Sequence, residues 1–108
     1  MPKYLVEATY TSEGVQGLIK AGGSARRKVV EDTCAAVGGK LEAFYFVFGD
    51  RDAVIIADIP SNEAAAALSM AVNATGALRT RTTPLLTLEE IDAAAKDEIH
   101  VHYRAPGT

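Results

Sequence analysis

The chain of 108 residues contains a single cysteine, Cys34, and therefore cannot form an intrachain disulfide. So little cysteine is typical of a protein in a reducing cytosol. No apolar run approaches the length that crosses a bilayer, and the N-terminal residues lack the apolar stretch of a signal peptide. These absences lead us to expect a cytoplasmic protein that does not contact a membrane.

Histidine is absent from residues 1–97, since His100 and His102 both lie near the C-terminus. A haem ligated by histidine, or acid–base catalysis by histidine, would therefore depend on the C-terminal tail. The spacing of the two imidazoles lets both reach one metal from a strand, but no cysteine or carboxylate lies near enough to complete a site. We expect solvated histidines, and neither a metal nor another cofactor.

An excess of basic residues is also missing. The net charge is −3, and the longest basic cluster, Arg26-Arg27-Lys28, is followed at once by Glu31 and Asp32. A dedicated nucleic-acid-binding protein shows a basic stripe instead. We interpret the cluster as one side of a solvated helix and expect no nucleic-acid partner.

The sequence does contain an ordinary globular composition, with 48% hydrophobic and 23% charged residues. Stretches rich in β-formers predict strands at residues 3–10, 40–48, 53–59 and 77–87. Capping residues, helical spacing and glycine breaks predict helices with caps at Ser12, Ser24, Ser61 and Thr87. Within the fourth strand, Pro84 indicates a sheet edge or a bulge.

This order of elements, β-α-β-β-α-β followed by a C-terminal helix, is typical of the ferredoxin-like α+β fold. Two right-handed crossovers then give a four-stranded antiparallel sheet with both main helices on one face. We place the folded domain at residues 1–97. Residues 98–108 form a tail that is mobile or lies against a partner.

The second and third predicted strands are apolar on both faces, although two helices can cover only one face. In the second strand one face carries Leu41, Ala43, Tyr45 and Val47, and the other carries Phe44, Phe46 and Phe48. A solvated face would alternate with polar residues. Because an exposed apolar face marks an interface and symmetric homo-oligomers are common, we expect the chain to pair with itself, sheet against sheet, in an α+β barrel.

The stretch from Tyr4 to about Lys96 resembles the GYD domain family of small bacterial and archaeal proteins. The resemblance rests on the segments Gly22–Arg27, Gly38–Phe46, Phe48–Asp52, Asn62–Ala66 and Thr80–Thr87. The family's Gly-x-Tyr-Asp signature reads Gly49-Asp50-Arg51-Asp52 here, with Arg51 where the tyrosine would be. Any role of that tyrosine is therefore lost in this chain.

The resemblance carries no function of its own. It implies an architecture similar to that of dimeric α+β barrel proteins. These include cofactor-independent monooxygenases, isomerases and haem enzymes, and also modules without known chemistry. Because fold does not fix function, the candidate residues have to be argued from their own chemistry.

Two groups of residues are candidates for holding an anion. Ser24 and Arg26 lie at a helix start, where free backbone N–H groups and the helix dipole favour a negative charge. Arg79 and Arg81 face the same side of the fourth strand and are suited to a ligand carboxylate in a sheet cleft. The competing interpretations are an ordinary helix cap for the first pair, and an exposed edge or a salt bridge between subunits for the second.

Glu7 is a candidate general base, because a carboxylate in an apolar cleft on a central strand keeps its proton more tightly. Pairing with an arginine, or exposure to solvent, would explain it equally well. Tyr10 and Tyr45, with Tyr4, are candidates to line the same cleft. Cys34 lies on an apolar helical stripe, which predicts a core thiol with a raised pKa.

The leading hypothesis is a homo-oligomeric binding or regulatory module for a small acidic or aromatic metabolite, contacted by Arg79, Arg81 and the tyrosines. One alternative is a cofactor-independent monooxygenase or isomerase, with Glu7 as base and Arg81 steadying an oxyanion. Another is an assembly protein without chemistry. The sequence leans weakly against an enzyme, because no nucleophile lies beside a base.

Overall fold

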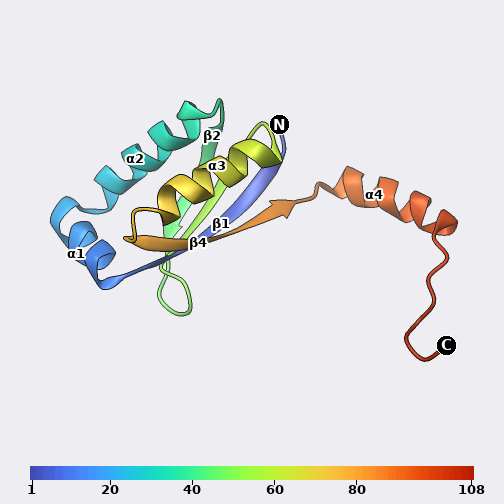
Figure 1. Ribbon diagram of the computed structural model, residues 1–108. Coiled ribbons are helices and arrows are strands. Elements are labelled where there is room, and N and C mark those ends of the chain that lie inside the picture. The colour runs from blue at the N-terminus through green and yellow to red at the C-terminus, as the bar shows by residue number, and fades with distance from the viewer.

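The computed structural model describes residues 1–108 (Figure 1). Its strands are β1 (Lys3–Tyr10), β2 (Lys40–Phe46), β3 (Ala53–Asp58) and β4 (Leu78–Leu85). Its helices are α1 (Ser12–Ala21), α2 (Gly23–Ala36), α3 (Asn62–Asn73) and α4 (Leu88–Asp97), and a 3₁₀ turn, η1, covers Glu98–His100. The predicted α+β class and order of elements are confirmed. None of the helices has both the length and the apolar character that a membrane span requires.

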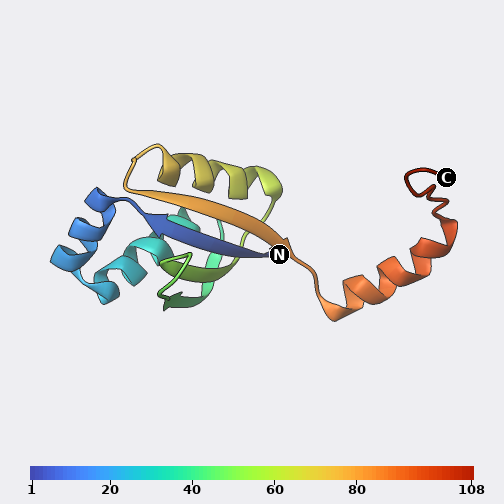
Figure 2. The same cartoon turned by 90° about the horizontal axis from the view of Figure 1, so that it is seen from below.

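The strands form one antiparallel sheet in the order β2-β3-β1-β4, as the ferredoxin-like fold requires. Helices α2 and α3 lie on the same face of this sheet (Figures 1 and 2). No element covers the other face, which we call the open face. Strand β4 is at the edge of the sheet, and this position accommodates Pro84 as predicted.

Three helices begin at a side-chain oxygen that accepts a hydrogen bond from their first turn, supplied by Thr11, Ser61 and Thr87. The capping box of Thr87 with Glu90 is confirmed. The predicted cap of α1 at Ser12 is wrong by one residue, because Thr11 is still extended and its hydroxyl receives the bond from Gly14. The predicted cap of α2 at Ser24 is also wrong. Gly22, with a φ of 84°, ends α1 and starts α2 without a side-chain cap.

A β-bulge between Leu41 and Ala43 changes which face the residues of β2 occupy. Leu41 pairs with Ala57 and packs against the core beside Phe44. The predicted placement of Leu41 on the same face as Ala43 is therefore wrong, because one extra residue inverts the alternation. The strand also ends at Phe46 rather than at the predicted residue 48, and Phe48 lies fully exposed in the following loop.

The core lies between the helices and the sheet, and it is small, since only 10 of the 108 residues are buried. The larger cluster is built around Tyr4, Cys34 and Ile55, and a smaller one joins Ala8, Ala53 and Leu78. The buried phenol of Tyr4 is satisfied because its O–H donates to Oδ1 of Asn62 at 2.6 Å. Helix α2 packs on β2 and α3 on β4, so the two helices stand over opposite edges of the sheet.

Residues 86–108, which include α4, extend away from the rest of the chain, and we call them the arm (Figures 1 and 2). Helix α4 packs mainly against η1, and every residue from Leu86 onward is exposed. The Cα radius of gyration is 17.2 Å, whereas a compact domain of this length has a radius of gyration of about 13 Å. The arm is therefore an extension of the domain and adds nothing to its core.

Candidate functional site

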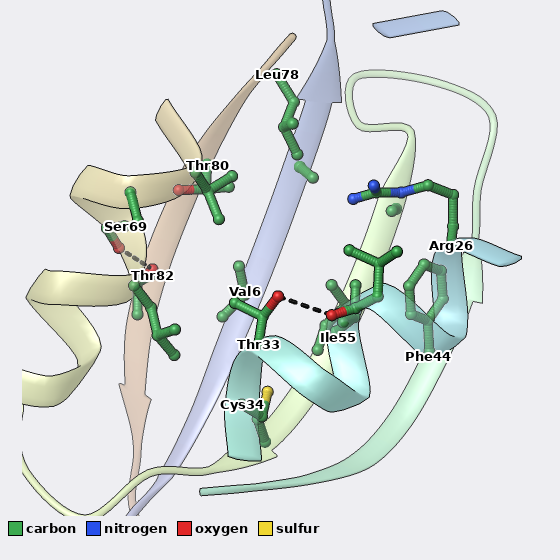
Figure 3. A pocket seen from close by; sticks show the side chains of 18 of the residues that line it. Val6, Arg26, Thr33, Cys34, Phe44, Ile55, Ser69, Leu78, Thr80 and Thr82 are labelled. Atoms are coloured by element: carbon green, nitrogen blue, oxygen red, sulfur yellow. Dashed lines mark hydrogen bonds between the residues drawn. The ribbon is translucent and has the colours of Figure 1, made fainter. Parts of the chain in front are cut away.

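A cleft of about 420 Å³ opens between α2, α3 and the helix-covered face of the sheet (Figure 3). Its floor is formed by the two central strands, where the small side chains of Ala8, Ala53 and Ala57 lie beside the larger ones of Val6 and Ile55. Alanine leaves depth where a larger side chain would fill the space between the helices. The cleft therefore follows from two features, the separation of the helices and the alanines beneath them.

The α2 wall of the cleft carries one charged group, Arg26. Its side chain points from α2 into the space between the helices, near Phe44 (Figure 3). The Nε atom of Arg26 is buried and has no hydrogen-bond partner. A buried donor without a partner within the chain is unusual in native proteins, and it marks a position that a ligand, an ion or an ordered water can occupy.

The interpretation of Arg26 as a solvated residue beside Arg27 and Lys28 is wrong. Arg26 precedes Val30 and Cys34 at intervals of one helical turn, and all three line the cleft. Arg27 and Lys28 do point outward, where they form ion pairs of 2.9 Å with Glu31 and Asp32. Only one member of the basic cluster therefore faces the interior.

The opposite wall is polar and joins α3 to β4. The Ser69 and Thr82 hydroxyls lie 3.2 Å apart, and both residues line the cleft. Asn73 bonds to Thr80 twice, through its Nδ2 to Oγ1 at 2.8 Å and through its Oδ1 from the backbone N–H at 3.0 Å. These hydroxyls give the cleft hydrogen-bonding groups facing its apolar floor (Figure 3).

Ser69, Asn73, Thr80 and Thr82 do not appear among the candidates drawn from the sequence. Two features of the sequence could have identified them. Thr80 and Thr82 continue the inward positions of β4 that begin with the buried Leu78. Ser69 and Asn73 lie one turn apart in a helix otherwise made mostly of alanine, leucine and other apolar residues. Polar residues at inward positions of both elements indicate a shared polar wall.

Cys34 is buried and lines the cleft, as a residue of the α2 stripe. Burial raises the pKa of its thiol above the ordinary value, because desolvation disfavours the thiolate. The predicted core position and the direction of the pKa shift are both confirmed. Such a thiol reacts slowly with electrophiles.

The tyrosines named as candidates lie in three different places. Tyr10 lines the cleft. Tyr4 is buried in the core, where its hydroxyl is bonded to Asn62. Tyr45 is 70% exposed and lies on the open face, because it pairs with Val54 rather than with a buried residue of β3. The expected single cleft lined by all three tyrosines is not formed.

The arginines of β4 also lie on the open face. Arg79 and Arg81 alternate with Leu78, Thr80 and Thr82, which face the helices. Register pairs form one row across the open face, from Tyr45 through Val54 and Glu7 to Arg81. The cleft between sheet and helices therefore contains neither arginine, and the expectation that they reach it is not met.

Glu7 occupies the same row and lies outside the apolar cleft in which a general base was expected. Its Oε2 lies 3.8 Å from Nε of Arg51, and its side chain is 27% exposed. Pairing with an arginine, the competing interpretation, fits this position. Ser24 is exposed in the first turn of α2 and lines no part of the cleft.

The loop Gly49-Asp50-Arg51-Asp52 joins β2 to β3 and is tied to the end of β1. The backbone N–H of Tyr10 donates to Oδ2 of Asp52 at 2.8 Å, and the N–H of Asp52 donates to the Ala8 carbonyl at 2.8 Å. Asp52 thus continues the pairing of β1 with β3 by one more step. These hydrogen bonds account for an aspartate at this position without a metal. No group of three or more His, Cys, Asp or Glu residues is arranged to hold a metal ion.

The profile of the GYD domain matches residues 4–95. The chain belongs to the GYD domain family. The matched region of this GYD domain includes both walls of the cleft, the open face and the tied loop. No curated protein matches the chain.

Proposed function

We propose that this GYD domain is a homo-oligomeric module that binds a small molecule with an apolar body and one anionic group in the cleft between α2 and α3. The observation that carries this function is the buried, unpartnered Nε of Arg26 in a largely apolar cleft that contains no other charged side chain. A carboxylate is the ligand group with the best fit, since a guanidinium binds it through two parallel hydrogen bonds. The proposal keeps the acidic or aromatic metabolite expected from the sequence and changes its contacts.

The size and lining of the cleft support a ligand of modest dimensions. Its volume of about 420 Å³ lies within the range of about 300–1,000 Å³ that is typical of small-molecule sites. Such sites are mostly apolar with a few polar groups that fix orientation, and 17 of the 23 lining residues here are hydrophobic. An alkyl chain or an aromatic ring would lie over the alanine floor, with its far end near Thr80 and Thr82.

The energetic reason for an anion is the state of Arg26. Leaving a buried donor without a partner costs about 1–3 kcal/mol, and more for a charged group. An anionic ligand offsets this penalty with a charge-assisted hydrogen bond, whereas a neutral acceptor such as a hydroxyl oxygen makes a bond of about half that strength. The site is therefore expected to discriminate between a carboxylate and its uncharged isostere.

Isothermal titration calorimetry with octanoate and 1-naphthoate tests this function. We expect binding of at least one of them, and weaker binding of 1-octanol and 1-naphthalenemethanol. Arg26→Gln should weaken carboxylate binding by about 10- to 100-fold, since a hydrogen bond to a charged group contributes about 1.5–3 kcal/mol. Arg27→Gln is the matched control, because Arg27 is the neighbouring arginine and pairs with Glu31 outside the cleft. Equal losses in both variants, or no preference for the acids, would contradict the proposal.

The oligomeric part of the function rests on the open face. Leu5, Val54 and Ile56 are only partly covered there, beside the exposed Tyr45. A sheet face of this composition is stabilised when a second copy covers it. Native mass spectrometry of the purified chain should give a dimer or a higher state, and a monomer at micromolar concentration would contradict this part of the proposal.

A further inference from the structure

The arm carries six large apolar side chains that are each more than half exposed. Exposed fractions are 62% for Leu86, 81% for Leu88, 51% for Ile91, 73% for Ile99, 65% for Val101 and 77% for Tyr103. Leu88, Ile91 and Ala95 follow helical spacing and form one stripe on α4. An isolated helix shorter than about 12–15 residues is marginal in water, and α4 has only 10 residues. The arm therefore requires a surface to pack against.

The open face is apolar at its centre and therefore matches the apolar stripe of the arm. Leu5, Val54 and Ile56 form its apolar centre, and no other element of the chain covers them. A helix of ten residues is about 15 Å long, and a sheet of four strands is about 14 Å wide. Helix α4 can therefore span the whole open face.

Charge supports the same pairing. On the open face Lys3 lies between Asp58 and Glu42, a group that carries one negative charge in excess, and Glu7 lies against Arg51. Arg79 and Arg81 form no ion pair within the chain, although Glu7 is the register partner of Arg81. With Lys3, Lys40 and Arg51, these arginines outnumber the carboxylates of Glu7, Glu42 and Asp58, so the charge of this face is positive on balance. The arm is acidic, with Glu89, Glu90, Asp92, Asp97 and Glu98 against Lys96 and Arg104.

We propose that the arm of each chain packs across the open face of a second copy, with the stripe of Leu88 and Ile91 on Leu5, Val54 and Ile56, and the acidic side chains near Arg79 and Arg81. Each chain has both an arm and an open face. Two chains related by a twofold axis can therefore bury both arms at once, and the assembly is closed as a dimer. This inference rests on the homo-oligomer of the proposed function and specifies which segment makes the contact. It replaces the direct sheet-to-sheet pairing expected from the sequence.

Ile91→Asp tests the arm without touching the body of the domain. Light scattering across a dilution series should give a dimer for the unaltered chain and at least a tenfold weaker dimer for Ile91→Asp. Ala93→Asp adds the same charge on the other side of α4 and should dimerise like the unaltered chain. A dimer that Ile91→Asp leaves intact would show sheet-to-sheet pairing, which overturns the arm while preserving the homo-oligomer. An unaltered chain that is monomeric overturns both.

Cross-linking identifies the surface on which the arm lies. Lys96 is on the arm, and Lys3 and Lys40 are on strands at the open face. In a dimer reassembled from ¹⁴N- and ¹⁵N-labelled chains, an amine-reactive reagent should join Lys96 of one isotope to Lys3 or Lys40 of the other. Links confined to single chains would mean that the arm folds back on its own sheet, and this would refute the exchange. Ligand binding is measured at Arg26 on the opposite face, so it succeeds or fails independently.

Discussion

Arg26 and Cys34 lie two turns apart on the same side of α2, and both line the cleft. The only cysteine of the chain is therefore a reporter of what the cleft contains, while the arginine is the group proposed to hold the ligand. This relationship allows binding to be followed without a label.

We expect the thiol of folded Cys34 to react with Ellman's reagent at least tenfold more slowly than in the urea-unfolded chain. The thiol is buried and its pKa is raised by desolvation, so little thiolate is present near neutral pH. Saturating octanoate should slow the reaction further, and this additional protection should be lost in Arg26→Gln. Protection that persists in Arg26→Gln would mean that the acid binds elsewhere.

The same thiol makes stability depend on alkaline pH. Its pKa is raised in the folded chain, so the folded chain keeps the proton to higher pH than the unfolded chain does. The resulting stability is complete below the unfolded pKa of about 8.5 and is lost as the pH rises through the folded pKa. Urea titrations should therefore give a free energy of unfolding that declines above about pH 8.5, and a flatter profile for Cys34→Ala.

Lys3 provides a check on this interpretation. Its pKa is raised by its hydrogen bond to Asp58 and then by the one to Glu42. Stability from this group is complete below the unfolded pKa of about 10.4 and is lost only above it. A decline between about pH 8.5 and 10 that survives in Cys34→Ala would contradict the assignment to the thiol.

Asp52 should matter for stability, because it ties the β2–β3 loop to the end of β1. Its carboxylate accepts the Tyr10 backbone N–H at 2.8 Å. Removing the acceptor in Asp52→Ala should lower the free energy of unfolding by about 1.5–3 kcal/mol, the usual contribution of a hydrogen bond to a charged group. Asp50→Ala is the control in the same loop and should change stability by less than about 0.5 kcal/mol.

Two glycines of α1 should respond in opposite directions to alanine. A Cβ at Gly14 would lie 2.0 Å from the Ala77 carbonyl oxygen, whereas a Cβ at Gly17 would meet nothing within 4 Å. Gly14→Ala should therefore destabilise the chain by about 1–3 kcal/mol, because the β4 entry has to move. Gly17→Ala should stabilise it by about 0.5–1 kcal/mol through helix propensity. Thermal melts of the two variants test this prediction. A change of the melting temperature in the same direction for both would contradict the close approach of Gly14 to the Ala77 carbonyl.

Local patterns were sufficient to predict the elements and the topology. The Thr87 capping box, the edge position of Pro84 and the buried stripe of Cys34 each depend on neighbours in the sequence, and the structure contains all three. These features are set by backbone hydrogen bonding and by helical or strand spacing, which are visible in a single sequence.

The contents of the cleft could not be predicted in the same way. Arg26 faces inward because α2 stands over β2 and leaves the centre of the sheet free, which is a property of packing between distant segments. Arg79 and Arg81 share one face, as the strand period requires, but the sequence alone does not say which face the helices take. The bulge before Ala43 placed Leu41 on the other face of β2 for a similar reason, since one extra residue inverts the alternation of the side chains that precede it.

The separation of α2 and α3 over opposite edges of the sheet has a consequence for the abundance of the protein in a cell. With only 10 of 108 residues buried, much of the apolar surface of the folded chain remains in contact with water. A ligand that binds only the folded chain raises the stability of that chain by about 2.7 kcal/mol when present at 100 times its dissociation constant. If the cleft binds the proposed ligand, chains without it would unfold more often and be degraded sooner, so the amount of protein would follow the supply of that ligand. Abundance itself would then be the signal that reports the metabolite.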